Sequence, residues 1–311
     1  QAEDGIRDRS PSRGLGDVYK RQIIDGKKIS EDILNEIHLK VQERANQGLK
    51  IPHLAAILVG DDGPSETYVN SKIKACEKVG FSSSLFNYDK NISEEKLIHE
   101  IELINNNDDI DGFIVQLPLP SSINQNNILN SVNPNKDVDG FHPINYGKMT
   151  LGANSFIPAT PYGILQLFQR YKIDLEGKKC LVIGRSQIVG RPISILLSQS
   201  NEFCNATVTL AHSRTIDLAR HTLNSDVIIS AIGKPEFLKA EMVKEGAIIV
   251  DVGISRVKDS SSKKGYRIVG DVDFKNVSKK ASYITPVPGG VGPMTIAMLL
   301  SNTLEACKKN D

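Results

Sequence analysis

The chain has 311 residues, and its 38 Lys and Arg residues nearly balance its 37 Asp and Glu residues. This balance argues against proteins that bind nucleic acid or a membrane surface through charge of one sign, and no apolar run reaches the length of a membrane span. The four cysteines form no CxxC pair and the six histidines show no metal-ligand spacing. We therefore expect a globular protein of a reducing compartment, the cytoplasm, with free thiols and no metal site.

Residues 1–22 are rich in Arg, Asp, Gly and Ser, and they lack both the apolar periodicity of a helix and the hydrophobic core of a signal peptide. A basic targeting arm is the functional alternative, but the acidic residues of the segment argue against it. We expect a disordered, non-native leader, with the folded chain starting near Ile23.

Residues 23–146 alternate between helix and strand patterns. Ser30 is a candidate N-cap for a helix that ends at Gly48, and LAAILVG (54–60) is an apolar run typical of a strand buried on both faces. Further helices are predicted over 65–80 and 93–105, and further strands over 84–88 and 112–117. Strands that alternate with helices predict a parallel α/β sheet.

The helix predicted over 65–80 has Ser65 and Gly80 as its candidate caps. Its buried stripe consists of apolar residues three to four apart, which are Val69, Ile73, Cys76 and Val79. Tyr68 and Lys72 are also four apart and share a different face, where an aromatic ring and an amine suit a flat substrate and a proton transfer. The alternative is that Lys72 is an ordinary solvated lysine.

Polar residues follow the strand predicted over 112–117. Gln116 and Leu117 lie at its carboxyl end, where parallel sheets bind ligands, and Gln116 either faces the crevice beside the Lys72 helix or bonds a loop backbone. The loop after it holds Asp137 and Asp139 between a proline and a glycine. Alone this loop is a generic turn, and a metal interpretation lacks a second carboxylate cluster.

A second unit starts after Tyr146, with a helix predicted near 161–171 and strands over 179–184, 206–211, 226–231 and 247–251. GRSQIVG (184–190) joins the first of these strands to a helix, as a phosphate cradle does, although Ser186 replaces the second glycine of the common fingerprint. The next strand ends in His212, Ser213 and Arg214 instead of the acidic residue that binds the free 2′-hydroxyl of NAD. These residues favour NADP.

The last part of the chain returns to the first unit. Residues 252–254 are expected over the cofactor and residues 259–265 form a polar surface excursion. The loop 286–293 is rich in Pro and Gly, so it either brings backbone close to a ligand or is a tight connection between domains. We expect the helix predicted over 295–308 to pack back on the first unit.

The predicted fold class is therefore two-domain α/β. A parallel-sheet substrate domain is formed by residues 23–146 and 286–311, and a Rossmann-like NADP-binding domain by residues 147–285. A cleft is expected between them.

Five segments in this order resemble one known family. They are YVNSKIKAC (68–76), DGFIVQLPLP (111–120), PNKDVDG (134–140), GRSQIVGRP (184–192) and TPVPGGVGPMT (285–295). Together they are similar to the bifunctional methylenetetrahydrofolate dehydrogenase/methenyltetrahydrofolate cyclohydrolase family, and the resemblance covers roughly Ile23 to Lys308. That family shares the departure from the ordinary glycine fingerprint.

The resemblance implies NADP-dependent oxidation of 5,10-methylenetetrahydrofolate to 5,10-methenyltetrahydrofolate, followed by hydrolysis to 10-formyltetrahydrofolate. It implies that Lys72 transfers protons, that Gln116 holds Lys72 and the substrate in register, and that Tyr68 stacks on the folate. Asp139 would accept hydrogen bonds from the pterin. The further substrate contacts implied are Val115, Leu117, Pro288, Gly289, Gly290, Val291 and Gly292. The implied NADP contacts are Gly184, Arg185, Ser186, Ser213, Arg214 and Ile254, with Arg185 and Ser213 nearest the 2′-phosphate.

The family usually forms a homodimer, so a homodimer is expected. Two alternatives are a monofunctional dehydrogenase of shikimate type and a nucleotide-binding module without catalysis. The order of the motifs and the PGGVGP loop (288–293) argue against the first. The second has no reason to keep Tyr68, Lys72, Gln116 and Asp139 together.

Overall fold

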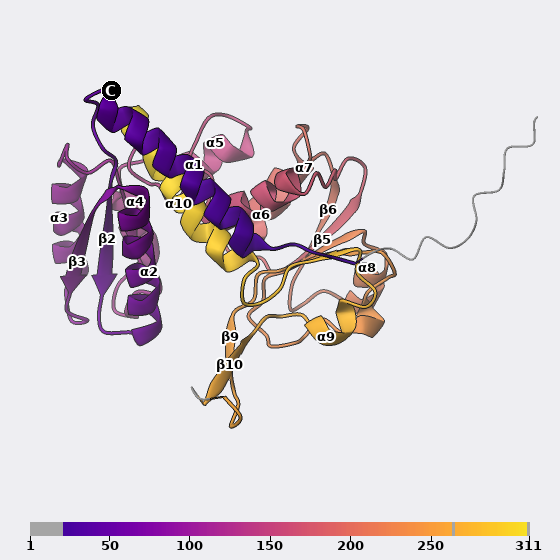
Figure 1. Cartoon of the computed structure of the whole chain (residues 1–311). Helices are drawn as coiled ribbons and strands as arrows, with labels where there is room; N and C mark the ends of the chain where they lie inside the picture. The colour runs from indigo at the N-terminus through magenta and orange to yellow at the C-terminus, as the bar shows by residue number, and fades with distance from the viewer. Residues whose placement is uncertain (1–20, 263–264, 310–311) are drawn as a thin grey trace, which may run out of the picture.

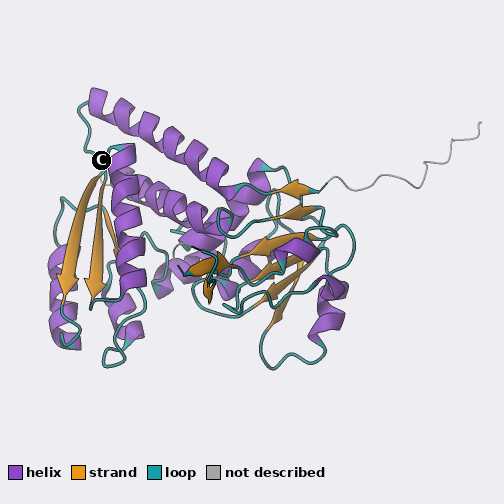
Figure 2. Cartoon of the chain, turned by 60° about the horizontal axis from the view of Figure 1, so that its bottom comes forward, coloured by secondary structure: helices purple, strands orange, loops and turns teal. Residues whose placement is uncertain are grey.

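The computed structural model describes residues 21–262 and 265–309. Two α/β units lie on either side of a pair of long helices, α1 (Gly26–Asn46) and α10 (Val291–Lys308), which run side by side across the middle of the molecule (Figure 1). Figure 2 shows a small sheet on one side of this pair and a larger sheet on the other. None of the helices in the described ranges is both long and apolar enough to cross a membrane.

The smaller sheet has the strand order β3-β2-β4, and both strand pairs are parallel, as predicted. Its strands are β2 (His53–Val59), β3 (Ser82–Tyr88) and β4 (Gly112–Val115), and its helices are α2 (Gly63–Val79), α3 (Glu94–Asn105), α4 (Gln125–Ser131) and α5 (Pro143–Thr150). Six of the seven residues of β2 are buried, which agrees with its continuous apolar sequence. Helices α4 and α5 were not predicted, because each spans only two turns and shows little periodicity.

Two predicted helix N-caps are wrong by a few residues. Helix α2 begins at Gly63, and the carboxylate of Asp62 caps it by accepting a hydrogen bond from the Ser65 amide (2.9 Å), so Ser65 lies inside the first turn. Helix α1 likewise begins at Gly26, and its cap is Asp25, five residues before Ser30. In both cases an upstream aspartate takes the role that the sequence assigned to a serine, and both residue types cap well.

The larger sheet has the order β1-β11-β8-β7-β5-β6, and every neighbouring pair is parallel. Its strands are β1 (Gln22–Ile23), β5 (Lys179–Ile183), β6 (Thr207–Ala211), β7 (Val227–Ser230), β8 (Ile248–Asp251) and β11 (Tyr283–Ile284). The four longest were predicted. Strands β1 and β11 have two residues each, too few for a pattern.

Strand β1 alters the predicted start of the chain. Gln22 pairs with Tyr283 and Ile23 with Ile284, so the described chain starts in the larger sheet and only then crosses to the smaller one. Gln22 is therefore ordered, although the leader was predicted to extend through it. The remainder of that prediction, residues 1–20, lies outside the described residues.

The second unit contains further elements around its sheet. These are α6 (Ala159–Arg170), α7 (Gly190–Ser198), α8 (Leu218–Leu223), the 3₁₀ turn η1 (Ala240–Met242), β9 (Ser255–Lys258), β10 (Tyr266–Val269) and α9 (Phe274–Val277). Strands β9 and β10 pair as an antiparallel ladder, and the polar excursion predicted over 259–265 lies between them in the chain, with residues 263–264 outside the described ranges.

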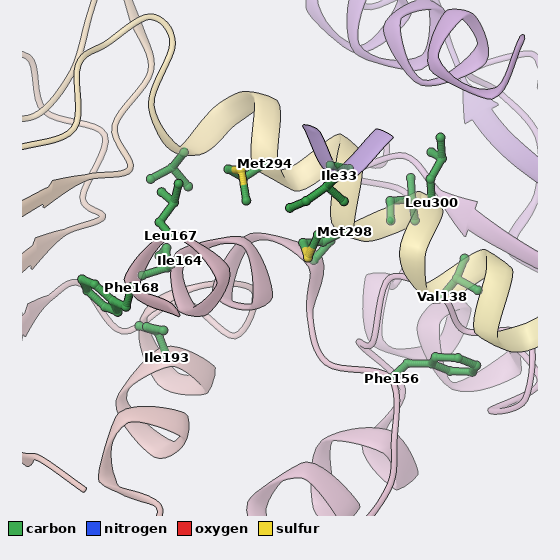
Figure 3. Packing of buried hydrophobic residues seen from close by; sticks show 14 of the residues in the cluster. Ile33, Val138, Phe156, Ile164, Leu167, Phe168, Ile193, Met294, Met298 and Leu300 are labelled. Carbon is green, nitrogen blue, oxygen red and sulfur yellow. The ribbon is translucent and has the colours of Figure 1, made fainter. Parts of the chain in front are cut away.

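Helix α10 forms the centre of the largest hydrophobic cluster. Its Met294 lies on the side of Ile164 and Leu167 of α6, and its Met298 lies beside Ile33 of α1 (Figure 3). The helix contacts α1, α2 and α6, which confirms that it packs back on the first unit. Because one helix packs against both units, it fixes the wall of the cleft between them.

Candidate active site

A cleft with a cavity volume of about 390 Å³ opens where the two units meet. Its walls come from α2, the carboxyl end of β4, the loop after Val138, and the starts of α6 and α10, together with two loops of the larger unit. The predicted site residues that line it are Tyr68, Lys72, Val115, Gln116, Leu117, Asp139, Ile254, Val291 and Gly292. The fold thus gathers residues that are more than 200 positions apart.

Lys72 is buried, with only 9% of its surface exposed, so the solvated-lysine alternative is wrong. Its Nζ donates a hydrogen bond to Oε1 of Gln116 (3.1 Å), and Nε2 of Gln116 donates to the Leu117 carbonyl (2.7 Å). Burial lowers the pKa of Lys72, and the charge of Asp139 opposes that shift. An amine with a lowered pKa is suited to proton transfer.

Asp137 and Asp139 are two residues apart but have different environments. The carboxylate of Asp137 is buried and accepts hydrogen bonds from the amides of Phe141 (3.1 Å) and His142 (2.9 Å) and from the side chain of Asn145 (2.9 Å). Asp139 is half-buried in the cleft wall, and within the described chain no hydrogen bond reaches its side chain. Burial raises the pKa of Asp139 and the nearby Lys72 opposes the rise. Asp137 therefore holds the loop, and Asp139 has its acceptors free for a ligand.

Tyr68 stands between the cleft and a second cavity of about 440 Å³. It is 42% exposed and lines both, as Val291 and Gly292 do. The other residues predicted from the same loop, Pro288, Gly289 and Gly290, line only the second cavity. The loop is thus beside the cleft, with only its last two predicted residues in the wall.

The loop packs closely on the start of α1. The Lys27 amide donates to the Gly289 carbonyl (2.8 Å), and a Cβ on Gly26 would lie 1.9 Å from the Gly290 carbonyl oxygen. Backbone approaches backbone here, which explains why this position needs glycine.

The loop Gly184–Gly190 has the shape of a phosphate cradle. Gly184 has φ +113°, and a Cβ on Gly190 would lie 2.0 Å from the Gly184 carbonyl oxygen, so both positions require glycine. The hydroxyl of Ser186 accepts hydrogen bonds from the amides of Val189 (3.2 Å) and Gly190 (3.3 Å) at the start of α7. The loop therefore places a tight turn and a helix N-terminus at the carboxyl end of β5, an arrangement that fits a dinucleotide.

The other predicted cofactor residues lie at the same edge of the larger sheet. Ile183 pairs with Ala211, so Arg185 follows β5 where Ser213 and Arg214 follow β6. All three side chains are exposed and lie outside the cleft lining, whereas Ile254 is in it. An extended ligand such as a dinucleotide would contact both places.

Several cleft residues were not predicted. They include Phe141, Ala159, Thr160, Ile188, Thr295 and Ile296, whereas Val252 belongs to the segment expected over the cofactor. The hydroxyls of Thr160 and Thr295 are hydrogen-bonded (2.9 Å) and tie α6 to α10 at the floor of the cleft. The only signal for these residues was their proximity in sequence to the predicted motifs.

Metal ligands are not gathered in the part of the chain that the structure describes. No three His, Cys, Asp or Glu side chains lie together there as a metal site needs. The prediction that the protein needs no metal stays a prediction.

Two family models match the chain. The tetrahydrofolate dehydrogenase/cyclohydrolase catalytic domain matches residues 24–139, and the NAD(P)-binding domain of the same family matches residues 158–311. The matches cover both sides of the cleft and argue against the monofunctional, shikimate-type alternative.

Individual proteins are similar over nearly the whole chain. The bifunctional protein FolD of Flavobacterium johnsoniae is 59% identical over 287 residues, which are 92% of this chain and 97% of that protein. The crystal structure of a FolD methylenetetrahydrofolate dehydrogenase/cyclohydrolase from Campylobacter jejuni has a TM-score of 0.87 and 48% identity, covering 93% of this chain and 99% of that one. A Trypanosoma brucei FolD complexed with NADP and an inhibitor has a TM-score of 0.86 and 38% identity, covering 92% and 97%.

Proposed function

The chain belongs to the tetrahydrofolate dehydrogenase/cyclohydrolase family, and from this premise we propose that its single cleft carries out both reactions. The enzyme oxidises 5,10-methylenetetrahydrofolate to 5,10-methenyltetrahydrofolate and then hydrolyses this product to 10-formyltetrahydrofolate. NADP, when bound, supplies the hydride acceptor of the first reaction.

We propose that the two reactions require different contributions from the cleft residues, which are positioning of the substrate in the oxidation and proton transfer in the hydrolysis. The methenyl cation is stabilised by its adjacent nitrogens, so the oxidation needs position more than a base. The hydrolysis adds water and opens a ring, and both steps move protons. Lys72 is assigned to these protons, supported by its burial, its lowered pKa and its hydrogen bond to Gln116.

The remaining cleft residues bind and orient the folate in this proposal. Tyr68 stacks on the ring system, supported by its exposed side chain at the mouth of the cleft. Asp139 accepts hydrogen bonds from the pterin, because its carboxylate has no hydrogen-bond donor from the described protein. Gln116 holds the Lys72 amine. Val115, Leu117, Val291 and Gly292 line the cleft around the substrate, and Pro288, Gly289 and Gly290 line the cavity beside it.

One observation carries the proposal. The buried Lys72, which bonds an amide and no carboxylate within the described ranges, faces a cleft whose opposite wall belongs to a dinucleotide-binding unit. The test is an assay of purified protein with methylenetetrahydrofolate and each dinucleotide, in which NADPH and methenyltetrahydrofolate are followed separately. We expect NADP-dependent formation of the methenyl compound and its decay without further cofactor. The bifunctional assignment would be contradicted by a protein that forms NADPH but does not hydrolyse methenyltetrahydrofolate faster than the spontaneous reaction.

Arg185→Ala should weaken the binding of NADP and leave the binding of NAD unchanged. We propose that Arg185 and Ser213 bind the 2′-phosphate, with Arg214 as a further contact, since all three are exposed at one edge of the sheet. Loss of one hydrogen bond to a charged group costs roughly 1.5–3 kcal/mol, so KM for NADP should rise about tenfold or more. The measurement is KM for NADP and for NAD on one preparation.

The matched control for this prediction is Arg191→Ala. Arg191 is also exposed, but it lines a separate cavity with Tyr146 and Gln187. Its variant should keep the KM of the wild type for both cofactors. If Arg185→Ala weakens the binding of NADP and NAD equally, Arg185 does not bind the 2′-phosphate.

We also propose the division into a substrate domain of residues 23–146 and 286–311 and a cofactor domain of residues 147–285, with β1 added to the sheet of the latter. The packing of α10 on α1 supports it. A cytoplasmic homodimer is proposed as well. Four buried free thiols agree with a reducing compartment, and sedimentation of the purified protein tests the dimer.

A further inference from the structure

Two buried carboxylates lie behind the cofactor edge of the larger sheet, and neither has a role in the reactions described above. Asp251 ends β8 and is 3% exposed, and Asp271 follows β10 and is fully buried. No ion pair reaches either carboxylate from the described residues. Their oxygens accept hydrogen bonds from six backbone amides and one hydroxyl.

The carboxylate of Asp271 holds the loop that follows β7. Its Oδ2 accepts from the amides of Ile232 (2.8 Å) and Gly233 (3.2 Å) and from the Ser230 hydroxyl (3.3 Å), and its Oδ1 accepts from the Lys234 amide (2.8 Å). Residues 231–234 are thereby wrapped around one buried side chain. The same loop touches the phosphate cradle, since a Cβ on Gly184 would lie 2.3 Å from the Ala231 carbonyl oxygen.

The carboxylate of Asp251 holds the loop that follows its own strand. It accepts from the Gly253 amide (2.9 Å) and from the amides of Asp271 (2.8 Å) and Val272 (2.9 Å). Val252 and Ile254, on either side of Gly253, line the folate cleft. A Cβ on Gly253 would lie 2.2 Å from Oδ1 of Asp271, so the two carboxylates and the loop form one close-packed unit.

These contacts form a continuous connection from the cleft to the cradle. It runs from the loop 252–254 through Asp251 to the backbone of Asp271, and from the Asp271 side chain to the loop 231–234 against Gly184. Both loops follow the carboxyl ends of parallel strands, where this type of sheet binds dinucleotides.

We propose that Asp251 and Asp271 are positioning residues for the dehydrogenase reaction: they fix the loops 231–234 and 252–254 at the separation that places NADP against the folate. The inference rests on the proposed function, since it assigns the two loops to the cofactor of that reaction. Hydrolysis needs no cofactor, so the separation of the two loops matters much less to it, although Val252 and Ile254 line the same cleft.

The geometry specifies carboxylates, because every partner is a donor. An asparagine at position 271 has the same shape, but its amide nitrogen would face either the Lys234 amide or the amides of Ile232 and Gly233. At least one loop amide is left without an acceptor, and the loop has to move to find another.

Asp271→Asn is therefore the test variant. We expect its dissociation constant for NADPH, measured by fluorescence titration, and its KM for NADP to rise by about tenfold or more. Its cyclohydrolase rate on preformed methenyltetrahydrofolate, assayed without cofactor, should stay within about twofold of wild type. This split distinguishes positioning from a general loss of structure, which would lower both activities together.

Asp273→Asn is the matched control. It makes the same chemical change two residues away, where the carboxylate accepts from Asn276 (2.9 Å) and lies 3.9 Å from Lys239. It should behave as wild type in all three measurements.

Unchanged NADPH affinity in Asp271→Asn, or equal loss of both activities, would overturn the inference. If this variant does not fold, Ser230→Ala and Asp251→Asn receive the same measurements, and weakened NADPH binding with retained hydrolysis in either is the supporting result. A wild-type protein without NADP-dependent dehydrogenase activity would instead overturn the proposed function itself.

Discussion

Lys72→Met should lose most of the cyclohydrolase activity, on the order of 10²–10⁴-fold, while dehydrogenase activity falls less. Methionine keeps the volume of the lysine stem but removes the amine that bonds Gln116. The variant then has no amine to transfer protons to and from the adduct of water with methenyltetrahydrofolate. Formation of the nitrogen-stabilised methenyl cation needs no such proton transfer. Methenyltetrahydrofolate should therefore accumulate.

Both rates are to be measured on one preparation, and Lys74→Met is the control. Lys74 lies two residues along α2 and is exposed, so its variant should keep both rates. Equal losses of both activities in Lys72→Met would mean that Lys72 binds substrate and carries no proton. Unchanged hydrolysis would remove it from the mechanism.

The pH dependence offers a second observation on the same residue. Burial lowers the pKa of Lys72, so its neutral amine becomes populated at a lower pH than that of an ordinary lysine. If the neutral amine is the base, the wild-type hydrolysis rate rises with pH as this proton is lost. The residual rate of Lys72→Met should lack that rise.

Asp139→Asn should lower both activities together, by roughly 10–100-fold, because it weakens folate binding before either reaction. Asparagine keeps one acceptor oxygen, but an NH₂ group takes the place of the other. This NH₂ group is a donor and cannot accept a hydrogen bond from the pterin N–H groups. The protein itself loses little, since Asp139 accepts no hydrogen bond from the described chain. The melting temperature should therefore stay close to that of wild type.

Asp137→Asn provides the contrast to this prediction. Its carboxylate accepts three hydrogen bonds inside the protein, so we expect a loss of about 1–3 kcal/mol of stability. Thermal unfolding and the KM for folate separate the two variants. If Asp139→Asn also unfolds early, or keeps the wild-type KM, the assignment of its carboxylate to the substrate is wrong.

Local patterns in the sequence predicted much of the fold. The apolar run of β2 identified a buried strand, and the strand–glycine–helix order at Gly184–Gly190 identified the phosphate cradle. The four-residue spacing of Tyr68 and Lys72 placed them on one face of a helix. These features depend on residues within one or two turns of each other, and the motifs that resemble the family are equally local.

The partners of these residues were decided by the tertiary structure. Helical spacing placed Lys72 outside the apolar stripe of α2 and left its burial open, because burial depends on what packs against that face. The fold brings Gln116 to it from the end of β4, 44 positions along the chain. The pairing of β1 with β11 likewise joins strands too short to show a pattern of their own.

The connection through Asp251 and Asp271 is the clearest case of partners that the sequence alone does not show. In the sequence both are aspartates within two residues of a glycine, and nothing distinguishes them from the half-buried Asp273 or from Asp139. A buried carboxylate is stable only where several donors meet, and here these come from three separate segments. A sequence shows which groups can accept hydrogen bonds, but only the folded chain brings the donors together, because they lie far apart along it.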